Sequence, residues 1–160
     1  MKTAVNLAAY PCLAALFGIT AYALLGPHAI HGPVPTHFNV AGQADAWGSP
    51  VSLWVLPVIA TFLFILMTLV SRFPESFNFP VRVTAANRAR LEGIALSMIA
   101  WLRLEVVALM TIIQAGVIRS VQQGRTVFAV WVLPVSLIVI FGTIGLHFVR
   151  ILRDSPRKAA

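Results

Sequence analysis

Three histidines and one aspartate in the segment 26–52 are the first side chains that could carry chemistry. His28, His31 and His37, with Asp45 nearby, offer nitrogen and oxygen ligands of the kind that zinc prefers. Their spacing is loose, and the prolines between them restrict how closely they can converge. We therefore predict no metal and no cofactor, and expect His37 to hydrogen-bond to Asp45 or to a backbone carbonyl.

A second set of polar side chains interrupts long apolar runs. Arg103 and Glu105 lie within the run 93–118, and His147 lies within the run 127–149. A charged residue at the centre of a membrane span costs about 2.5–3.5 kcal/mol on insertion scales. Each of these side chains therefore needs a polar partner or a route to the membrane surface.

Arg103 and Glu105 are expected to have different surroundings. Because they are two positions apart on a helix, they should point to nearly opposite sides. The Arg103 side chain is long enough to extend to lipid headgroups. Glu105 is shorter, so we expect it to face the interior of the bundle and to pair with His147, Arg150 or Arg72. A proton or ion relay through Glu105 and His147 is the functional alternative.

Four apolar segments must position these side chains. They lie at about 4–25, 53–70, 93–118 and 127–149, and each approximates the roughly 20 residues that a helix needs to cross a bilayer. The chain is 59% hydrophobic and only 11% charged, whereas a soluble domain is about 25% charged. The sequence therefore predicts an all-α fold, an integral membrane four-helix bundle that forms a single transmembrane domain over 1–160.

The basic residues predict the orientation of this bundle. Nine of the twelve lysines and arginines lie near the two chain ends or in the loop 71–92, whereas only Arg119 and Arg125 flank the opposite side. Because basic residues concentrate in cytoplasmic loops, we expect both termini and the loop 71–92 in the cytoplasm and an ordered loop 26–52 outside. The basic residues behind the net charge of +7 are then expected to contact the lipid bilayer. Because they do not form one continuous basic face, we expect no nucleic-acid partner.

A short repeat suggests a further level of organisation. Residues 54–58 and 131–135 both read Trp-Val-Leu-Pro-Val, and each copy opens a span that runs from outside to inside. The chain could consist of two parallel helical hairpins, as some transporters do, or two apolar spans could share these letters by chance. In both cases we expect Pro57 and Pro134 to bend their helices, because each removes a backbone donor.

Small residues should mark the packing face of the first span, since they let helices approach closely in lipid. They are Ala8, Ala14, Ala15, Gly18 and Ala21. Replacing Gly18 by leucine is accordingly expected to loosen the bundle.

The loop 26–52 carries the most specific pattern in the sequence. It contains Pro35-Thr36-His37-Phe38-Asn39-x-x-Gly42-x-x-Asp45-x-Trp47-Gly48-Ser49. We expect tight turns at 39–42 and 45–48, with the Asn or Asp side chain accepting backbone donors. The pattern resembles the signature of a bacterial membrane domain of unknown function, number 1648, which forms the N-terminal part of SdpI-like immunity proteins.

A second stretch adds to this resemblance. It lies in the loop before the third span and includes Asn78, Pro80, Asn87 and Arg88. The resemblance then covers roughly residues 10–115 and implies immunity or signalling in the bacterial cytoplasmic (inner) membrane, at the level of a shared domain. In the same stretch, Thr84 could cap the third helix, and Arg88 should pair with Glu92 at i, i+4.

Three functions follow from these patterns. The first is non-enzymatic recognition of a peptide or envelope partner through the outer loop, since the sequence shows no nucleophile–base set and no phosphate-binding glycine motif. The binding residues would be Pro35, Thr36, His37, Asn39, Gly42, Asp45, Trp47 and Gly48. The second is an accessory subunit of an oligomer or larger membrane complex. The third is a metal-dependent membrane enzyme or small transporter.

Overall fold

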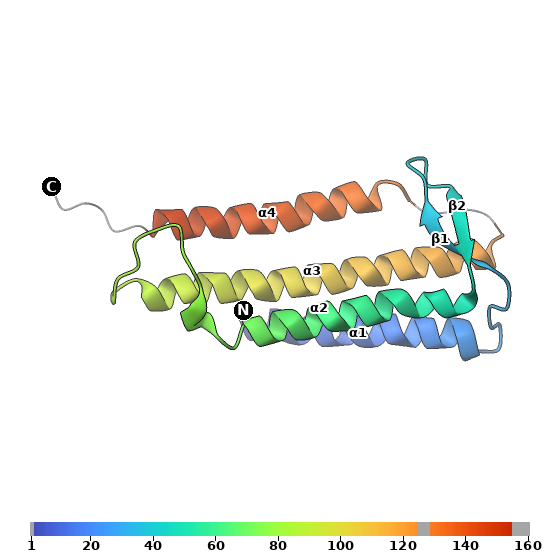
Figure 1. Cartoon of the computed structure of the whole chain (residues 1–160), viewed down its shortest axis with the longest axis horizontal. Helices are drawn as coiled ribbons and strands as arrows, with labels where there is room; N and C mark the ends of the chain where they lie inside the picture. Colours follow the sequence, from blue (N-terminus) through green and yellow to red (C-terminus); the bar gives the residue numbers. More distant parts are fainter. Residues whose placement is uncertain (1, 125–128, 155–160) are drawn as a thin grey trace.

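The computed structural model describes residues 2–124 and 129–154 (Figure 1). Its long elements are the helices α1 (Lys2–Leu25), α2 (Val55–Val70), α3 (Arg88–Gln122) and α4 (Val132–Arg153). Shorter ones are the strands β1 (Val34–Phe38) and β2 (Ala44–Gly48) and the 3₁₀ helices η1 (Pro50–Trp54) and η2 (Pro74–Ser76). Four helical segments in the described part of the chain are long and apolar enough to cross a membrane. The chain thus has the features of a multi-pass membrane protein.

The expectation of an all-α fold was incomplete, because the segment between the first two spans forms an antiparallel two-stranded sheet. The span boundaries also differ from those expected. The third helix is 35 residues long and begins five residues earlier than the apolar run. The second span begins with η1, and the described part of the fourth helix begins at Val132. Residues 127 and 128 of the expected fourth span lie outside the described residues.

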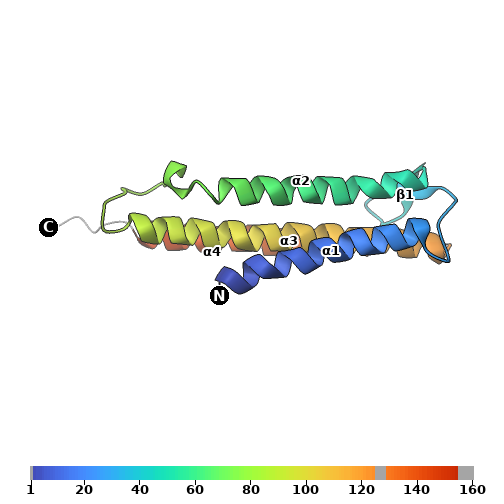
Figure 2. The same ribbon diagram turned by 90° about the horizontal axis from the view of Figure 1, so that it is seen from below.

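Helix α3 is the centre of the arrangement. In Figure 1, α1 and α2 run along one side of α3 and α4 runs along the other; in Figure 2, α4 lies behind α3, with α1 and α2 to either side. Contact between α4 and the rest of the described chain is made almost entirely with α3. The four helices that were expected are present, and α4 is attached to the other three mainly through α3. Apolar side chains are solvated by lipid as well as by other helices, so a few polar contacts with α3 are sufficient to hold α4.

The packing face of α1 is not the one expected. Its fully buried residues are Ala9, Leu16, Thr20 and Ala23, which follow a near-heptad spacing along the side that meets α3. The small residues Ala14, Ala15 and Gly18 are exposed, and a Cβ added at Gly18 would meet nothing within 4 Å. Gly18 therefore does not lie in this contact, and the structure gives no reason for leucine at this position to loosen the bundle.

The two Trp-Val-Leu-Pro-Val copies occupy equivalent places. Trp54 and Trp131 are the N-cap residues of α2 and α4 and have nearly the same backbone angles. Pro57 and Pro134 are each the third helical residue. Amides in a first turn have no acceptor within the helix, so the bends expected at these prolines are not required. The two-hairpin arrangement stays a prediction.

The two ends of the molecule differ in character. The end that carries β1 and β2, here the hairpin end, is tied down by a core of Ala23, Ile30, Val34, Leu53, Val117 and Ile118. The opposite end, here the basic end, holds η2, the start of α3 and the end of α4 (Figure 1). Its basic residues are Arg72, Arg82, Arg88, Arg90, Arg150 and Arg153.

Candidate recognition site at the hairpin end

The turn between β1 and β2 is built by one side chain. The Oδ1 of Asn39 accepts hydrogen bonds from the backbone N–H groups of Ala41 (2.9 Å) and Gln43 (3.0 Å). Gly42 follows with a φ of 75°, a conformation that favours glycine. The tight turn predicted at 39–42 is confirmed, and the sequence pattern Asn-x-x-Gly encodes it locally.

The turn predicted at 45–48 was wrong, because these residues form β2. Asp45 accepts from the His37 ring instead of from its own backbone, with Nδ1 and Oδ1 2.5 Å apart. The predicted partner of His37 is thus confirmed. Both side chains are well exposed, so the pair joins the strands on the surface and contributes little to stability.

The loop histidines do not gather into a metal centre. In the part of the chain that the structure describes, no three His, Cys, Asp or Glu side chains lie close enough together to hold a metal ion. His28 and His31 border a separate depression beside the end of α3, away from the His37–Asp45 pair. The zinc alternative therefore lacks a set of ligands among the described residues.

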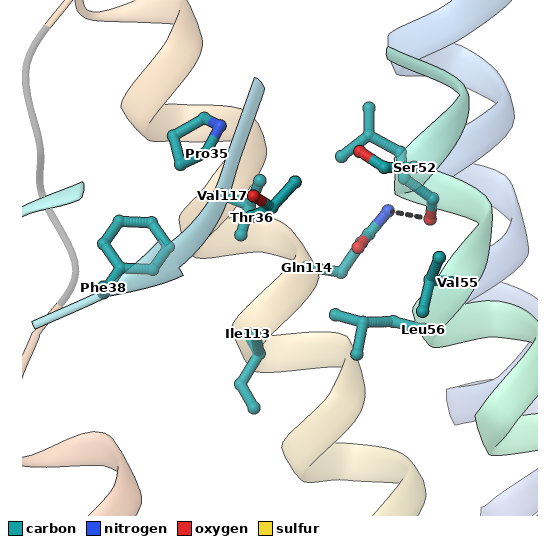
Figure 3. A pocket seen from close by; sticks show the side chains of 10 residues that line it. Pro35, Thr36, Phe38, Ser52, Val55, Leu56, Ile113, Gln114 and Val117 are labelled. Atoms are coloured by element: carbon teal, nitrogen blue, oxygen red, sulfur yellow. Dashed lines mark hydrogen bonds between the residues drawn. The ribbon is translucent and has the colours of Figure 1, made fainter. Parts of the chain in front are cut away.

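A pocket of about 210 Å³ lies beneath β1, between that strand, the start of the second span and α3 (Figure 3). Its walls are mainly apolar. The residues that line it are Pro35, Thr36, Phe38, Ser52, Leu53, Val55, Leu56, Ile113, Gln114 and Val117. β1 and the start of the second span, which are close in the sequence, thus share one apolar pocket with the distant helix α3 at the hairpin end.

Gln114 supplies the buried polar group of this pocket. Its side chain is 1% exposed, and its Nε2 donates to Thr20 Oγ1 (2.8 Å) and to the Leu53 carbonyl (2.9 Å). Figure 3 shows the amide between β1 and α2, with the bond to the backbone dashed. These two bonds join α3 to α1 and to η1. Gln114 was not among the residues predicted from the sequence, although a lone amide in an apolar span was a usable signal.

The structure separates the predicted loop residues into two groups. Pro35 and Thr36 line the pocket. The others build or border the hairpin outside it, and they are His37, Asn39, Gly42, Asp45, Trp47 and Gly48. A Cβ on Gly48 would lie 2.8 Å from the Thr36 Cγ2. Gly48 therefore lets Thr36 keep its position beside the pocket.

Arg103 was expected to extend to lipid headgroups, but it does not. Its side chain is buried between α1, α2 and α3, where it donates to Thr68 Oγ1 (2.8 Å) and to Asn6 Oδ1. The guanidinium also lies over the Phe64 ring, 5.0 Å from the centroid. Asn6 and Thr68, each about one turn inside a basic helix end, offer nearer acceptors than the headgroups do.

Glu105 lies on the opposite side of α3, as its spacing from Arg103 predicts, but its partner is different from those expected. Thr143 on α4 donates to Glu105 Oε1 at 2.5 Å. His147, one turn further along, directs Nδ1 to the Thr143 carbonyl (2.8 Å) and Nε2 to Ser97 Oγ (3.4 Å). Glu105 therefore pairs with a neutral threonine that lies one helical turn before His147 on α4, in place of the ion pair that was expected.

The loop residues at the basic end have structural contacts. The Nδ2 of Asn87 donates to the Arg82 carbonyl (3.0 Å) and the Asp154 carbonyl (3.3 Å). Thr84 does not cap α3, because Asn87 is the N-cap and accepts from the Thr84 backbone N–H (2.7 Å).

The predicted pair of Arg88 with Glu92 is confirmed at 2.8 Å, and Arg88 also donates to the Glu75 carbonyl. Asn78 and Pro80 are exposed, and no hydrogen bond to the Asn78 side chain occurs among the described residues. The structure therefore does not bring the four predicted loop residues together in one site.

Comparison with known families identifies part of the chain. Residues 12–61 match the family described as Domain of unknown function (DUF1648). The matched segment includes most of α1, the hairpin, η1 and the start of α2, so it contains two of the three elements around the pocket. The comparisons with curated proteins and with solved structures gave no match. The family that the sequence resemblance indicated is thus confirmed for residues 12–61.

Proposed function

We propose that this chain is a non-enzymatic protein of the bacterial cytoplasmic membrane that recognises a peptide partner outside the membrane, at the pocket beneath β1. The role we propose is in immunity or signalling, as the resemblance of the loop pattern to SdpI-like proteins implies. The distribution of arginines supports the orientation, since the basic end would face the cytoplasm and the hairpin end the outside.

The composition of the pocket is the observation that carries the proposal. Small-ligand sites combine apolar walls with a few fixed polar groups, and here Gln114 is such a group. Both hydrogen bonds of its amide use Nε2, so the carbonyl Oε1 has no partner among the described residues. A free acceptor favours a ligand that brings an N–H donor. A peptide has such donors, whereas a lipid acyl chain has none.

The volume agrees with a peptide anchor. A dry cavity of about 150 Å³ can hold benzene, so a pocket of about 210 Å³ has room for one large apolar or aromatic side chain. In this proposal Pro35, Thr36 and Phe38 contact the anchor. The turn at Asn39 and the His37–Asp45 pair hold the hairpin over it.

A photo-crosslinking experiment in native membranes tests the proposal. A photoreactive phenylalanine analogue is placed at Val55, which lines the pocket, or at Phe62, two turns further along α2 and 64% exposed. We expect a polypeptide adduct from position 55 and only lipid adducts from position 62. If both positions give the same lipid adducts and no polypeptide, the pocket does not recognise a peptide.

An accessory subunit is the second candidate function, and the packing of α4 favours it. This helix contacts α3 almost alone and exposes large apolar residues along its length. The same photoreactive analogue at Phe141, which is 66% exposed, would capture a companion protein in stoichiometric amount. Lipid adducts alone at this position would contradict the subunit function without affecting the pocket proposal.

A further inference from the structure

A second pocket, of about 310 Å³, lies at the basic end between α3 and α4. Ala89, Arg90, Gly93, Ile94 and Ser97 line it from α3. His147 and Arg150 line it from α4. It lies far from the hairpin end and is independent of the proposed function.

The sequence makes room for this pocket. Ala89, Gly93 and Ser97 recur at every fourth position, so they lie one above another on a single face of α3. Small side chains on this face cannot fill the space that α4 leaves. The helices remain held on both sides of the gap, by the Glu105–Thr143 bond within the membrane span and by the Asn87–Asp154 bond at the basic end.

The charge of the pocket is positive. Arg90 pairs with Asp154 at 3.0 Å, which offsets one positive charge. Arg150 has no ion pair with any described residue. With a neutral His147, the pocket carries one uncompensated positive charge and therefore suits a ligand with one negative charge.

One polar group deeper in the pocket, the Ser97 hydroxyl, can donate a hydrogen bond to a ligand. A carbonyl only accepts, so His147 Nδ1 carries the proton that is directed to Thr143 O. In the neutral ring Nε2 is then an acceptor for Ser97, but the 3.4 Å separation makes that bond weak. The Ser97 hydroxyl is thus available to donate to an oxyanion beside the Arg150 guanidinium.

We propose that this pocket binds a phosphate group, namely the phosphodiester of an anionic phospholipid headgroup. Arg150 lies one turn from the end of α4, at the level where headgroups meet a helix that crosses the membrane. Basic pockets between membrane helices on the cytoplasmic side are suited to such groups. A soluble phosphate compound would offer the same chemistry, and the test separates these two sources.

The test measures lipid retention by native mass spectrometry and thermal stability in detergent. The additions are phosphatidylglycerol, phosphatidylcholine or inorganic phosphate at equal concentration. Arg150→Gln removes the unpaired charge, and Arg153→Gln removes an equal charge from the same helix end outside the pocket. Ser97→Leu fills the pocket without changing the charge. Arg150 is exposed, so its replacement should not prevent folding.

We expect phosphatidylglycerol to bind and stabilise the protein more than phosphatidylcholine does. Arg150→Gln should weaken retention about tenfold or more, because it removes a charge-assisted hydrogen bond. Ser97→Leu should also weaken it. Arg153→Gln should cost at most about fivefold, the general effect of one basic residue near an anionic surface.

If inorganic phosphate alone gives the full stabilisation, and Arg150→Gln abolishes it, the pocket binds phosphate and a soluble phosphate compound is its source. Equal effects of Arg150→Gln and Arg153→Gln, or equal binding of both lipids without a response to phosphate, would overturn the proposal.

Discussion

Arg103 on α3 donates a hydrogen bond from Nη1 to the Oγ1 of Thr68 on α2, 2.8 Å away. The guanidinium is buried, and none of the described carboxylates forms an ion pair with it. Neutral acceptors on α1 and α2 and the Phe64 ring therefore solvate this charge. Its Nε has no partner among the described residues, so the remaining bonds matter more to the stability of the three helices.

Replacing Thr68 by valine tests this relationship. The change keeps the shape of the side chain but leaves one guanidinium N–H group buried without an acceptor. We expect a loss of about 1–2 kcal/mol in the free energy of unfolding, at the upper end for bonds between membrane helices because the donor is charged. The measurement is denaturation in mixed detergent micelles.

Thr61→Val is the matched control. Thr61 and Thr68 each donate to the carbonyl four residues earlier, at 2.8 and 2.7 Å, but only Thr68 also accepts from Arg103. Equal losses for the two variants would show that the interhelical bond contributes nothing measurable.

Gln114→Leu should weaken the attachment of α3 to α1 and to η1 at the pocket. The variant loses the bonds to Thr20 and to the Leu53 carbonyl, and we expect the free energy of unfolding to fall by about 1–2 kcal/mol. Gln123→Leu, at an exposed position just after α3, should change it by less than about 0.5 kcal/mol. A Gln114 variant as stable as the wild type would mean that the two bonds do not hold η1 against α3.

Gly48→Ala should disturb the hairpin. The added Cβ would lie 2.8 Å from Thr36 Cγ2, too close for a side-chain methyl group to tolerate in place. We expect faster amide hydrogen exchange over residues 34–48 and a loss of about 1–3 kcal/mol from overpacking.

Two further variants make this result specific. Thr36→Ser removes Cγ2 and should restore slow exchange in the Gly48→Ala background. Gly18→Ala, where the surroundings are open, should be neutral or stabilise by up to about 1 kcal/mol through helix propensity. A Gly48→Ala protein with unchanged exchange would show that β1 and β2 can separate without cost.

Asn87→Ala should loosen the basic end. It removes the bonds to the Arg82 and Asp154 carbonyls that connect the start of α3 to its preceding loop and to the end of α4. We expect faster amide exchange in residues 82–90 and 150–154, with the centre of α3 unchanged. Asn78→Ala is the control, because Asn78 is exposed. The same exchange pattern in both variants would contradict the role of Asn87.

Sequence patterns predicted the features that depend on neighbouring residues. Asn39 and Gly42 form their turn through bonds within five residues, so the spacing Asn-x-x-Gly was sufficient. The Arg88–Glu92 pair follows from helix periodicity in the same way. The opposite directions of Arg103 and Glu105 also follow from that periodicity, whereas their partners do not.

Sequence patterns were wrong where residues far apart must meet. Small residues on α1 predicted a packing face, but the fit of Leu16 and Thr20 against α3 decided it. The turn predicted at 45–48 was also wrong, because the pairing of β1 with β2 places these residues in a strand, although the predicted His37–Asp45 bond is present. In both cases a contact across the structure replaced the local alternative.

Four helices long and apolar enough to cross a membrane could be predicted from the sequence alone, because an apolar run of about 20 residues needs only its own backbone bonds to be stable in lipid. Only the folded structure shows that Gln114 lies beneath β1, that Arg103 is solvated by Asn6 and Thr68, and that α4 packs almost entirely on α3 among the described residues. Apolar surfaces do not select one another in lipid, so the few polar contacts between helices set these positions.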